Sequence, residues 1–247
     1  MLVKKIIKVV LLLLALLYIF LQSLALELEG SVLSAVILVL LTCLYVGWTK
    51  YKSKLFLGFL VFFSTAQILS IAAYFIPEVG LDQVDAMYFG INVIYIMAYT
   101  FLIIKIIRQF NLRKVFQQLT VPIIILVILD VFCVTLISGT TEGIFNYYEY
   151  VLEFTYNAVV MILLSLALID YMYRNSNKSM LFLIGSIFIV FSEIIQLAYY
   201  YILPDDNLGF VYSLFFIVAF IFLYQQSQSK VTEPVKAYSD NPVEAYE

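Results

Sequence analysis

The sequence predicts an all-α, polytopic membrane protein with about eight transmembrane helices. Hydrophobic residues make up 64% of the chain and charged residues 13%, whereas a soluble domain carries roughly 25% charged residues. Apolar runs of about 20 residues recur along the chain, and each can cross about 30 Å of hydrocarbon as a helix. The sequence lacks the period-two alternation of an outer-membrane barrel, so the spans are expected to be helical.

Polar breaks separate each apolar run from the next. In chain order, the predicted spans are Ile6–Leu26, Ser31–Thr49, Leu55–Ile76, Ala86–Ile107, Thr120–Ser138, Tyr150–Tyr173, Met180–Ile202 and Gly209–Tyr224. The first run follows three lysines and closes with Ser23-Leu24-Ala25, which a signal peptidase could accept. Its apolar core exceeds the roughly 7–15 residues of a signal sequence, so we expect an uncleaved anchor. Residues 1–226 are then a helical bundle, and residues 227–247 a polar, partly disordered cytoplasmic tail.

The charges predict the orientation of the bundle. Threading eight spans from a cytoplasmic N-terminus places all 14 basic residues on the cytoplasmic side: Lys4, Lys5, Lys8, Lys50, Lys52, Lys54, Lys105, Arg108, Arg113, Lys114, Arg174, Lys178, Lys230 and Lys236. The alternate loops carry acidic residues and no lysine or arginine. This is the positive-inside pattern, and it predicts a multi-pass protein of the cytoplasmic (inner) membrane with both termini in the cytoplasm.

Several kinds of chemistry are excluded by composition. The chain has no histidine, which removes ordinary haem ligation, a Ser-His-Asp triad and histidine metal sites. Cys43 and Cys133 lie inside apolar runs without a CxxC pattern, where thiols usually behave as small hydrophobic groups. We therefore expect no metal, no cofactor and, because the charges are segregated by membrane side, no nucleic-acid partner.

The third and seventh runs resemble one another. Aligning residues 55–76 with 181–202 gives identity at eight of 22 positions. Polar residues also coincide at the spacing i, i+3, i+7, which is one face of a helix. The coinciding pairs are Gln67 with Glu193, Ser70 with Gln196, and Tyr74 with Tyr200. The sequence therefore predicts a four-plus-four parallel repeat, with a pseudo-twofold axis along the membrane normal and both polar stripes facing the interior.

Four carboxylates fall within the spans: Asp130, Glu153, Asp170 and Glu193. Asp170 is expected to pair with Arg174 at i+4, and Glu153 is expected to reach water near the outer surface. Asp130 and Glu193 lie about 15–20 Å into the membrane by helical rise, at the depth of Gln67, so the three could meet in one site. A charged carboxylate is costly there, so Glu193 is expected to hold its proton and to act either as a general acid or as a packing hydrogen bond.

The string from Ile184 to Glu193, followed by Leu197-Ala198, resembles the late Gly-small-x-x-Phe-x-x-Ser-Asp signature of the YhhN-like, lysoplasmalogenase family. The family's second acidic signature, Gly-Asp, would stand at Ala66-Gln67, and its Ala-His at Ala98-Tyr99. A Lys-Pro signature of the family is replaced by Gly30-Ser31. The resemblance covers the third to eighth spans loosely. It implies eight spans and hydrolysis of vinyl-ether lysolipids within the bilayer.

The departures from the family pattern predict a divergent member with altered or lost catalysis. An amide cannot replace a carboxylate as an acid or base, so the second carboxylate is expected to be Asp130 or to be missing. The expected catalytic residues are Glu193 and Asp130. The expected lipid-binding residues are Gln67, Ser70, Tyr74, Tyr99, Gln196 and Tyr200.

Other functions remain open at this point. A non-catalytic accessory or scaffold subunit is one alternative, and a small transporter suggested by the repeat is another. The tail repeats Pro-Val-x-Ala-Tyr at residues 234–238 and 242–246. This tandem motif is either solvated chain or a docking peptide for a protein partner, since repetition raises the effective concentration.

Overall fold

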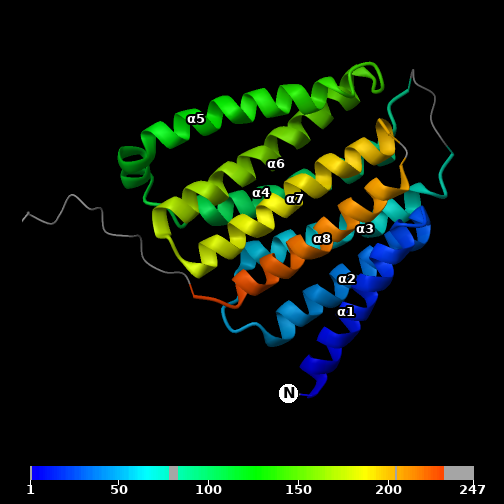
Figure 1. Ribbon diagram of the computed structural model, residues 1–247, viewed down its shortest axis with the longest axis horizontal. Coiled ribbons are helices and arrows are strands. Elements are labelled where there is room, and N and C mark those ends of the chain that lie inside the picture. The colour runs from blue at the N-terminus through cyan, green and yellow to red at the C-terminus, as the bar shows by residue number, and fades with distance from the viewer. Residues whose placement is uncertain (1, 78–82, 204, 231–247) are drawn as a thin grey trace, which may run out of the picture.

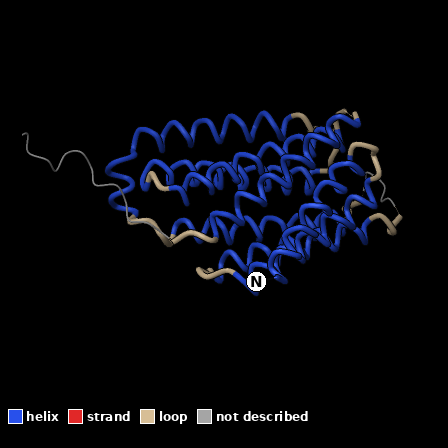
Figure 2. Tube along the Cα trace, turned by 60° about the horizontal axis from the view of Figure 1, so that its bottom comes forward, coloured by secondary structure: helices blue, strands red, loops and turns tan. Residues whose placement is uncertain are grey.

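The computed structural model describes residues 2–77, 83–203 and 205–230, and they form a bundle of helices joined by loops at its two ends (Figures 1 and 2). The helices are α1 (Leu2–Gln22), α2 (Glu27–Trp48), α3 (Lys54–Ala73), α4 (Ala86–Ile107), α5 (Leu112–Gly139), α6 (Tyr147–Arg174), α7 (Asn177–Tyr201) and α8 (Asp206–Ser227). The predicted all-α fold is confirmed. The tail motifs at 234–246 lie outside the described residues.

Polar residues just before the apolar runs determine where the helices begin. Asp85 caps α4 by accepting hydrogen bonds from the backbone N–H groups of Met87 and Tyr88, at 2.8 and 3.0 Å. Asn146 and Ser176 form capping boxes at the starts of α6 and α7. Such caps satisfy N–H groups that have no partner inside the helix. Several helices therefore start earlier than the apolar runs suggested.

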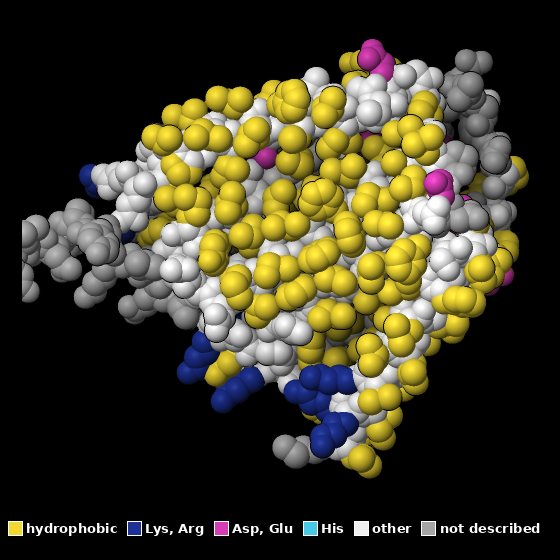
Figure 3. Space-filling model, in the orientation of Figure 1, with side chains coloured by type: hydrophobic (Ala, Val, Ile, Leu, Met, Phe, Trp, Pro, Cys, Tyr) yellow, Lys and Arg dark blue, Asp and Glu magenta, His cyan; other side chains and the backbone are white. Residues whose placement is uncertain are grey.

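Seven of the eight helices, α2 to α8, are long and apolar enough to cross a membrane by length and composition. The remaining helix, α1, begins with the three lysines. Figure 3 shows Lys and Arg gathered at one end of the molecule and most of the visible acidic side chains toward the other, with a broad hydrophobic surface between them that contains one acidic side chain. These features indicate a multi-pass membrane protein, and we call the two ends the basic end and the acidic end.

The helices pack in chain order within each half of the repeat, α1 on α2, α2 on α3 and α3 on α4, and likewise from α5 to α8. Between the halves, α4 packs on α6 and α1 on α8. A twofold axis that exchanges α1–α4 with α5–α8 would turn the α4–α6 contact into an α8–α2 contact and the α1–α8 contact into an α5–α4 contact. Neither of these pairs packs extensively among the described residues. The backbone contacts between the halves therefore do not follow the predicted twofold symmetry.

Helix α5 lies at the edge of the bundle against α6 (Figure 1). It starts at Leu112, before the predicted boundary at Thr120, and is kinked at Leu119, whose φ and ψ are −120° and 25°. The cause is Pro122, which lacks a backbone N–H group and whose ring crowds the preceding turn. Most large side chains between Val121 and Leu136 are exposed on its surface.

The last residue of α1, Gln22, lies very close to two glycines on other helices, Gly209 and Gly30. Gln22 is buried, and its backbone oxygen would lie 2.5 Å from a Cβ atom added to Gly209 on α8. A Cβ atom added to Gly30 on α2 would lie 2.2 Å from the Gln22 side-chain nitrogen. Gly30, which stands where the resembled family has Lys-Pro, therefore allows α1 to approach α2 closely.

Candidate functional site

A cavity of about 370 Å³ lies among α3, α4, α6 and α7. Its wall includes Tyr74 after the last turn of α3, the α4 cap Asp85 and the last residue of α7, Tyr201. The cavity therefore reaches the acidic end of the bundle. Residues from both copies of the predicted polar stripe line it: Gln67, Ser70, Tyr74, Glu193, Gln196 and Tyr200. Gln67 and Glu193 thus both line this cavity, whereas Tyr74 and Tyr200 are also 41% and 38% exposed.

Glu193 lies about two turns from the end of α7. The Tyr156 hydroxyl group, from α6, donates a hydrogen bond to one carboxyl oxygen at 2.7 Å. The Tyr99 hydroxyl group, from α4, donates to the other. Tyr99 and Tyr156 are buried, while Glu193 is partly accessible along the cavity wall. The carboxyl group is thus fixed by two phenols and still presented to the cavity.

A second carboxyl group, Glu153 on α6, lines the same cavity. The residue is 5% exposed and lies along the wall of this cavity, toward the acidic end at which it was predicted. Asn157 donates a hydrogen bond to one carboxyl oxygen at 2.7 Å, and the Tyr88 hydroxyl group donates to the other at 3.4 Å. The sequence carried a signal for this role, because Asn157 follows Glu153 at the i+4 spacing that places both on one helix face.

Gln67 is oriented by its neighbour on α2. Its side-chain oxygen accepts a hydrogen bond from the Ser34 hydroxyl group at 2.9 Å, which leaves the amide N–H₂ group available to donate. Tyr74 accepts a hydrogen bond from Ser31 at 3.4 Å. These contacts make the α3 part of the cavity wall a hydrogen-bonding surface without a carboxylate, whereas α6 and α7 contribute Glu153 and Glu193.

Asp130 is not part of this cavity, contrary to the expectation that it would join Glu193 and Gln67. It lies in a separate groove of about 390 Å³ between α5 and α6, where it accepts a hydrogen bond from Ser165 at 2.8 Å. The rest of that groove is largely apolar. Asp130 therefore faces α6 from α5 in that groove and does not reach Glu193 or Gln67. Asp170 pairs with Arg174 at 2.8 Å, as its i, i+4 spacing predicted.

Aromatic rings form much of the cavity wall. Tyr95 packs edge-on against Phe63 with ring centroids 4.9 Å apart, and against Tyr156 at 6.3 Å. Phe63 and Phe216 also line the cavity, with ring centroids 6.1 Å apart. Within the described residues, no cluster of three or more His, Cys, Asp or Glu side chains could hold a metal ion. The cavity therefore combines the carboxyl groups of Glu153, Glu193 and the helix cap Asp85 with phenols and phenyl rings.

The fold and cavity define a class: a polytopic α-helical membrane protein with an internal polar and aromatic chamber. No family model, curated protein or solved structure gives a match to the chain.

Proposed function

We propose that the protein is a lysoplasmalogenase-like membrane hydrolase that binds a single-chain, vinyl-ether lipid in the cavity between α3, α4, α6 and α7. The observation that carries this proposal is that Glu153 and Glu193 line one cavity of about 370 Å³ whose wall also contains tyrosine and phenylalanine rings. A vinyl ether needs an acid and a base in one place. The chain supplies both, and the second carboxylate is Glu153 rather than Asp130.

The chemistry assigns one role to each carboxyl group. Glu193 protonates the alkene carbon remote from the ether oxygen, which leaves an oxocarbenium ion. Glu153 takes a proton from water as the water oxygen bonds to the cationic carbon. The resulting hemiacetal collapses to a fatty aldehyde and the glycerol hydroxyl group, so the net reaction consumes one water molecule. Tyrosine and phenylalanine rings stabilise the cation, because the ring face is electron-rich.

The polar wall of the cavity suits the lipid headgroup. Gln67, Ser70 and Gln196 offer hydrogen-bonding groups about two turns or less from the acidic end. Tyr74 and Tyr200 lie nearer that end. We place the chain in the cytoplasmic membrane with its basic end in the cytoplasm, since basic residues favour that side. The lipid then enters from the outer leaflet.

The test is aldehyde release from a 1-alkenyl lysophospholipid by the purified full-length protein in lipid nanodiscs, with a 1-acyl lysophospholipid as the substrate control. Glu193→Gln keeps the shape of the side chain and removes the transferable proton, so we expect the rate to fall by about 10²–10⁴. Glu153→Gln should cause a loss of similar size. Absence of aldehyde from the unaltered protein, or a rate that Glu193→Gln does not change, would contradict the proposal.

A second candidate is a non-catalytic lipid-binding subunit. It is favoured by one observation: both oxygens of Glu193 and both oxygens of Glu153 already accept hydrogen bonds from protein groups. Such a fully paired network also serves packing. Retention of the vinyl-ether lipid through purification, without aldehyde release, would select this function over the hydrolase.

A further inference from the structure

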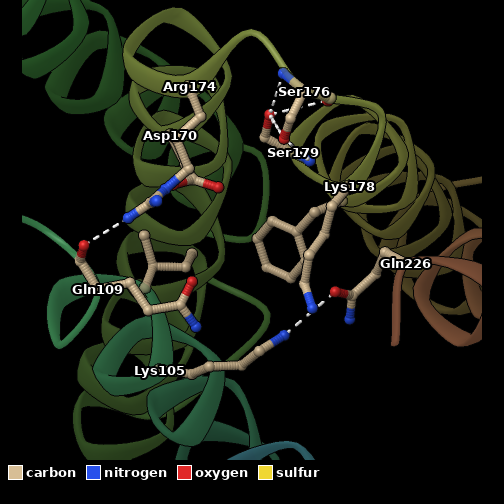
Figure 4. A pocket seen from close by; sticks show the side chains of 10 residues that line it. Lys105, Gln109, Asp170, Arg174, Ser176, Lys178, Ser179 and Gln226 are labelled. Carbon is tan, nitrogen blue, oxygen red and sulfur yellow. Dashed lines mark hydrogen bonds and ion pairs between the residues drawn. The ribbon is translucent and has the colours of Figure 1, made fainter. Parts of the chain in front are cut away.

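A second polar cluster, shown in Figure 4, lies at the basic end of the bundle. It shares no lining residue with the carboxyl cavity. It combines three basic side chains, Lys105 from α4, Arg174 from α6 and Lys178 from α7, with one carboxyl group, that of Asp170. Arg174 is engaged with Asp170 at 2.8 Å and also donates to the backbone oxygen of Gln109. Among the described residues that line this cavity, the basic side chains outnumber the carboxyl groups.

Lys105 is the unusual member of this cluster. Its side chain is 6% exposed, and its ammonium group lies 5.0 Å from the ring centre of Phe56 and 5.2 Å from that of Phe182. It donates a hydrogen bond to the side-chain oxygen of Gln226 at 3.3 Å. Within the described part of the chain, neither Lys105 nor Lys178 forms an ion pair with a carboxylate. Removing a charge from water without a counter-ion is costly, so a buried lysine of this kind is suited to an anionic partner.

Gln226 supplies an independent indication of a ligand. The residue is 1% exposed, and its side-chain N–H₂ group has no hydrogen-bond partner among the described residues. Buried donors of this kind are rarely left unpaired. Gln226 lines the same small cavity as Lys105 and Lys178, as Figure 4 shows. The cavity therefore presents an unpaired amide donor beside two ammonium groups.

The start of α7 adds to this arrangement. Ser176 and Ser179, which form the α7 capping box, line the cavity, and a helix N-terminus favours a negative charge. The enclosed space is about 20 Å³, enough for one water-sized group. It accommodates one oxygen atom of an oxyanion, whose remaining atoms would lie at the mouth of the cavity.

We propose that this basic-end cavity binds a phosphate group, with one phosphate oxygen held by Lys105, Lys178 and the Gln226 amide. The same chemistry is offered by inorganic phosphate and by the phosphomonoester of an anionic lipid such as phosphatidic acid. The site is distinct from the carboxyl cavity and is independent of the hydrolase proposal.

The test is the apparent unfolding temperature of the full-length protein in phospholipid-free detergent. One arm adds inorganic phosphate against sodium chloride of equal ionic strength, and the other adds phosphatidic acid against phosphatidylcholine in phosphate-free buffer. A tenfold excess over the dissociation constant should raise the midpoint by about 3–6 °C. A shift in the first arm identifies free phosphate as a ligand, and a shift in the second arm alone identifies the lipid.

The variants are Lys105→Met and Gln226→Leu, which remove the ammonium group and the amide, and both should abolish the shift. Lys5→Met is the matched control, because Lys5 is an exposed lysine on α1 at the same end, and it should keep the shift. If Lys105→Met fails to fold, Gln226→Leu and Lys178→Gln carry the test. Absence of a shift in both arms for the unaltered protein, or a shift that survives in the variants, would overturn the proposal.

Discussion

The carboxyl group of Glu193 is held by two phenols from two other helices, Tyr99 on α4 and Tyr156 on α6. Each hydroxyl group is directed to a different oxygen, so the carboxyl plane is fixed relative to the cavity. A catalytic acid benefits from such fixation, because its carboxyl group is already oriented before the substrate binds. The same contacts tie α4, α6 and α7 together.

Removing one of these phenols should therefore affect stability. We expect Tyr156→Phe to lower the free energy of unfolding by about 0.5–1.5 kcal/mol, since it removes a buried hydrogen bond. A double-mutant cycle with Glu193→Leu should give a coupling energy of about 0.5–3 kcal/mol. Tyr95→Phe, which removes a hydroxyl group from the same cavity wall, is the control. Strict additivity of Tyr156→Phe and Glu193→Leu would show that the hydrogen bond contributes nothing.

The close contacts between Gln22 of α1 and two glycines lead to a second prediction for single residues. Gly209→Ala should destabilise the protein by about 1–3 kcal/mol, because its Cβ atom would meet the rigid backbone oxygen of Gln22. Gly30→Ala should cost less, since the contact there is the end of a flexible side chain. Gly90→Ala is the control: no atom lies within 4 Å of its added Cβ in the described structure, and alanine favours a helix. Equal midpoints for Gly209→Ala and Gly90→Ala would refute the close contact.

At the scale of elements, helix faces were predictable where polar residues repeat at helical spacing. The stripes on α3 and α7 were predicted from Gln67 and Glu193 and their i+3 and i+7 neighbours, and both stripes line the cavity. Asp130 is not accompanied by polar residues at helical spacing. Its depth in the span gave a height in the membrane but no direction around the helix axis, and the exposed apolar side chains of α5 do not mark a buried face.

The position of Glu153 within its helix differs from the prediction for another reason. The apolar run suggested a span from Tyr150, which put Glu153 in the first turn, but the Asn146 capping box starts α6 at Tyr147. Glu153 therefore lies nearly two turns inside the helix. Capping residues are visible in a sequence, but whether a polar segment is helix or loop depends on its tertiary contacts. Here Glu149 also accepts a hydrogen bond from the backbone N–H group of Asp85, at 2.9 Å.

The separation of the α5–α6 groove from the carboxyl cavity gives a prediction for α5. Asp130→Leu should leave aldehyde release and lipid retention within about twofold of the unaltered protein, because Asp130 lines the α5–α6 groove. Glu153→Gln, on α6, is the comparison that should reduce the rate strongly. The measurement is the same nanodisc assay. A large loss in Asp130→Leu, with normal folding, would return Asp130 to the catalytic site.

For the whole molecule, the separation of charge predicts sidedness. In a background with Cys43 and Cys133 replaced, Glu142→Cys in the exposed loop after α5 should react with a membrane-impermeant thiol reagent added to intact cells. Lys52→Cys, in the loop between α2 and α3, should react only after the cells are opened. The physical reason is that basic loops are retained in the cytoplasm. The reverse pattern would invert the topology.

The contact between the first and last helices has a consequence for biogenesis. The end of α1 packs on α2 and on Gly209 of α8, so its complete packing site does not exist until α8 has been synthesised. A ribosome delivers the N-terminal helices first. The first helix must therefore wait beside α2 while the rest of the chain is inserted, and the arrival of the last helix completes its docking. Translation arrested before α8 should leave α1 packed on α2 alone. Such an intermediate is a natural substrate for membrane quality control.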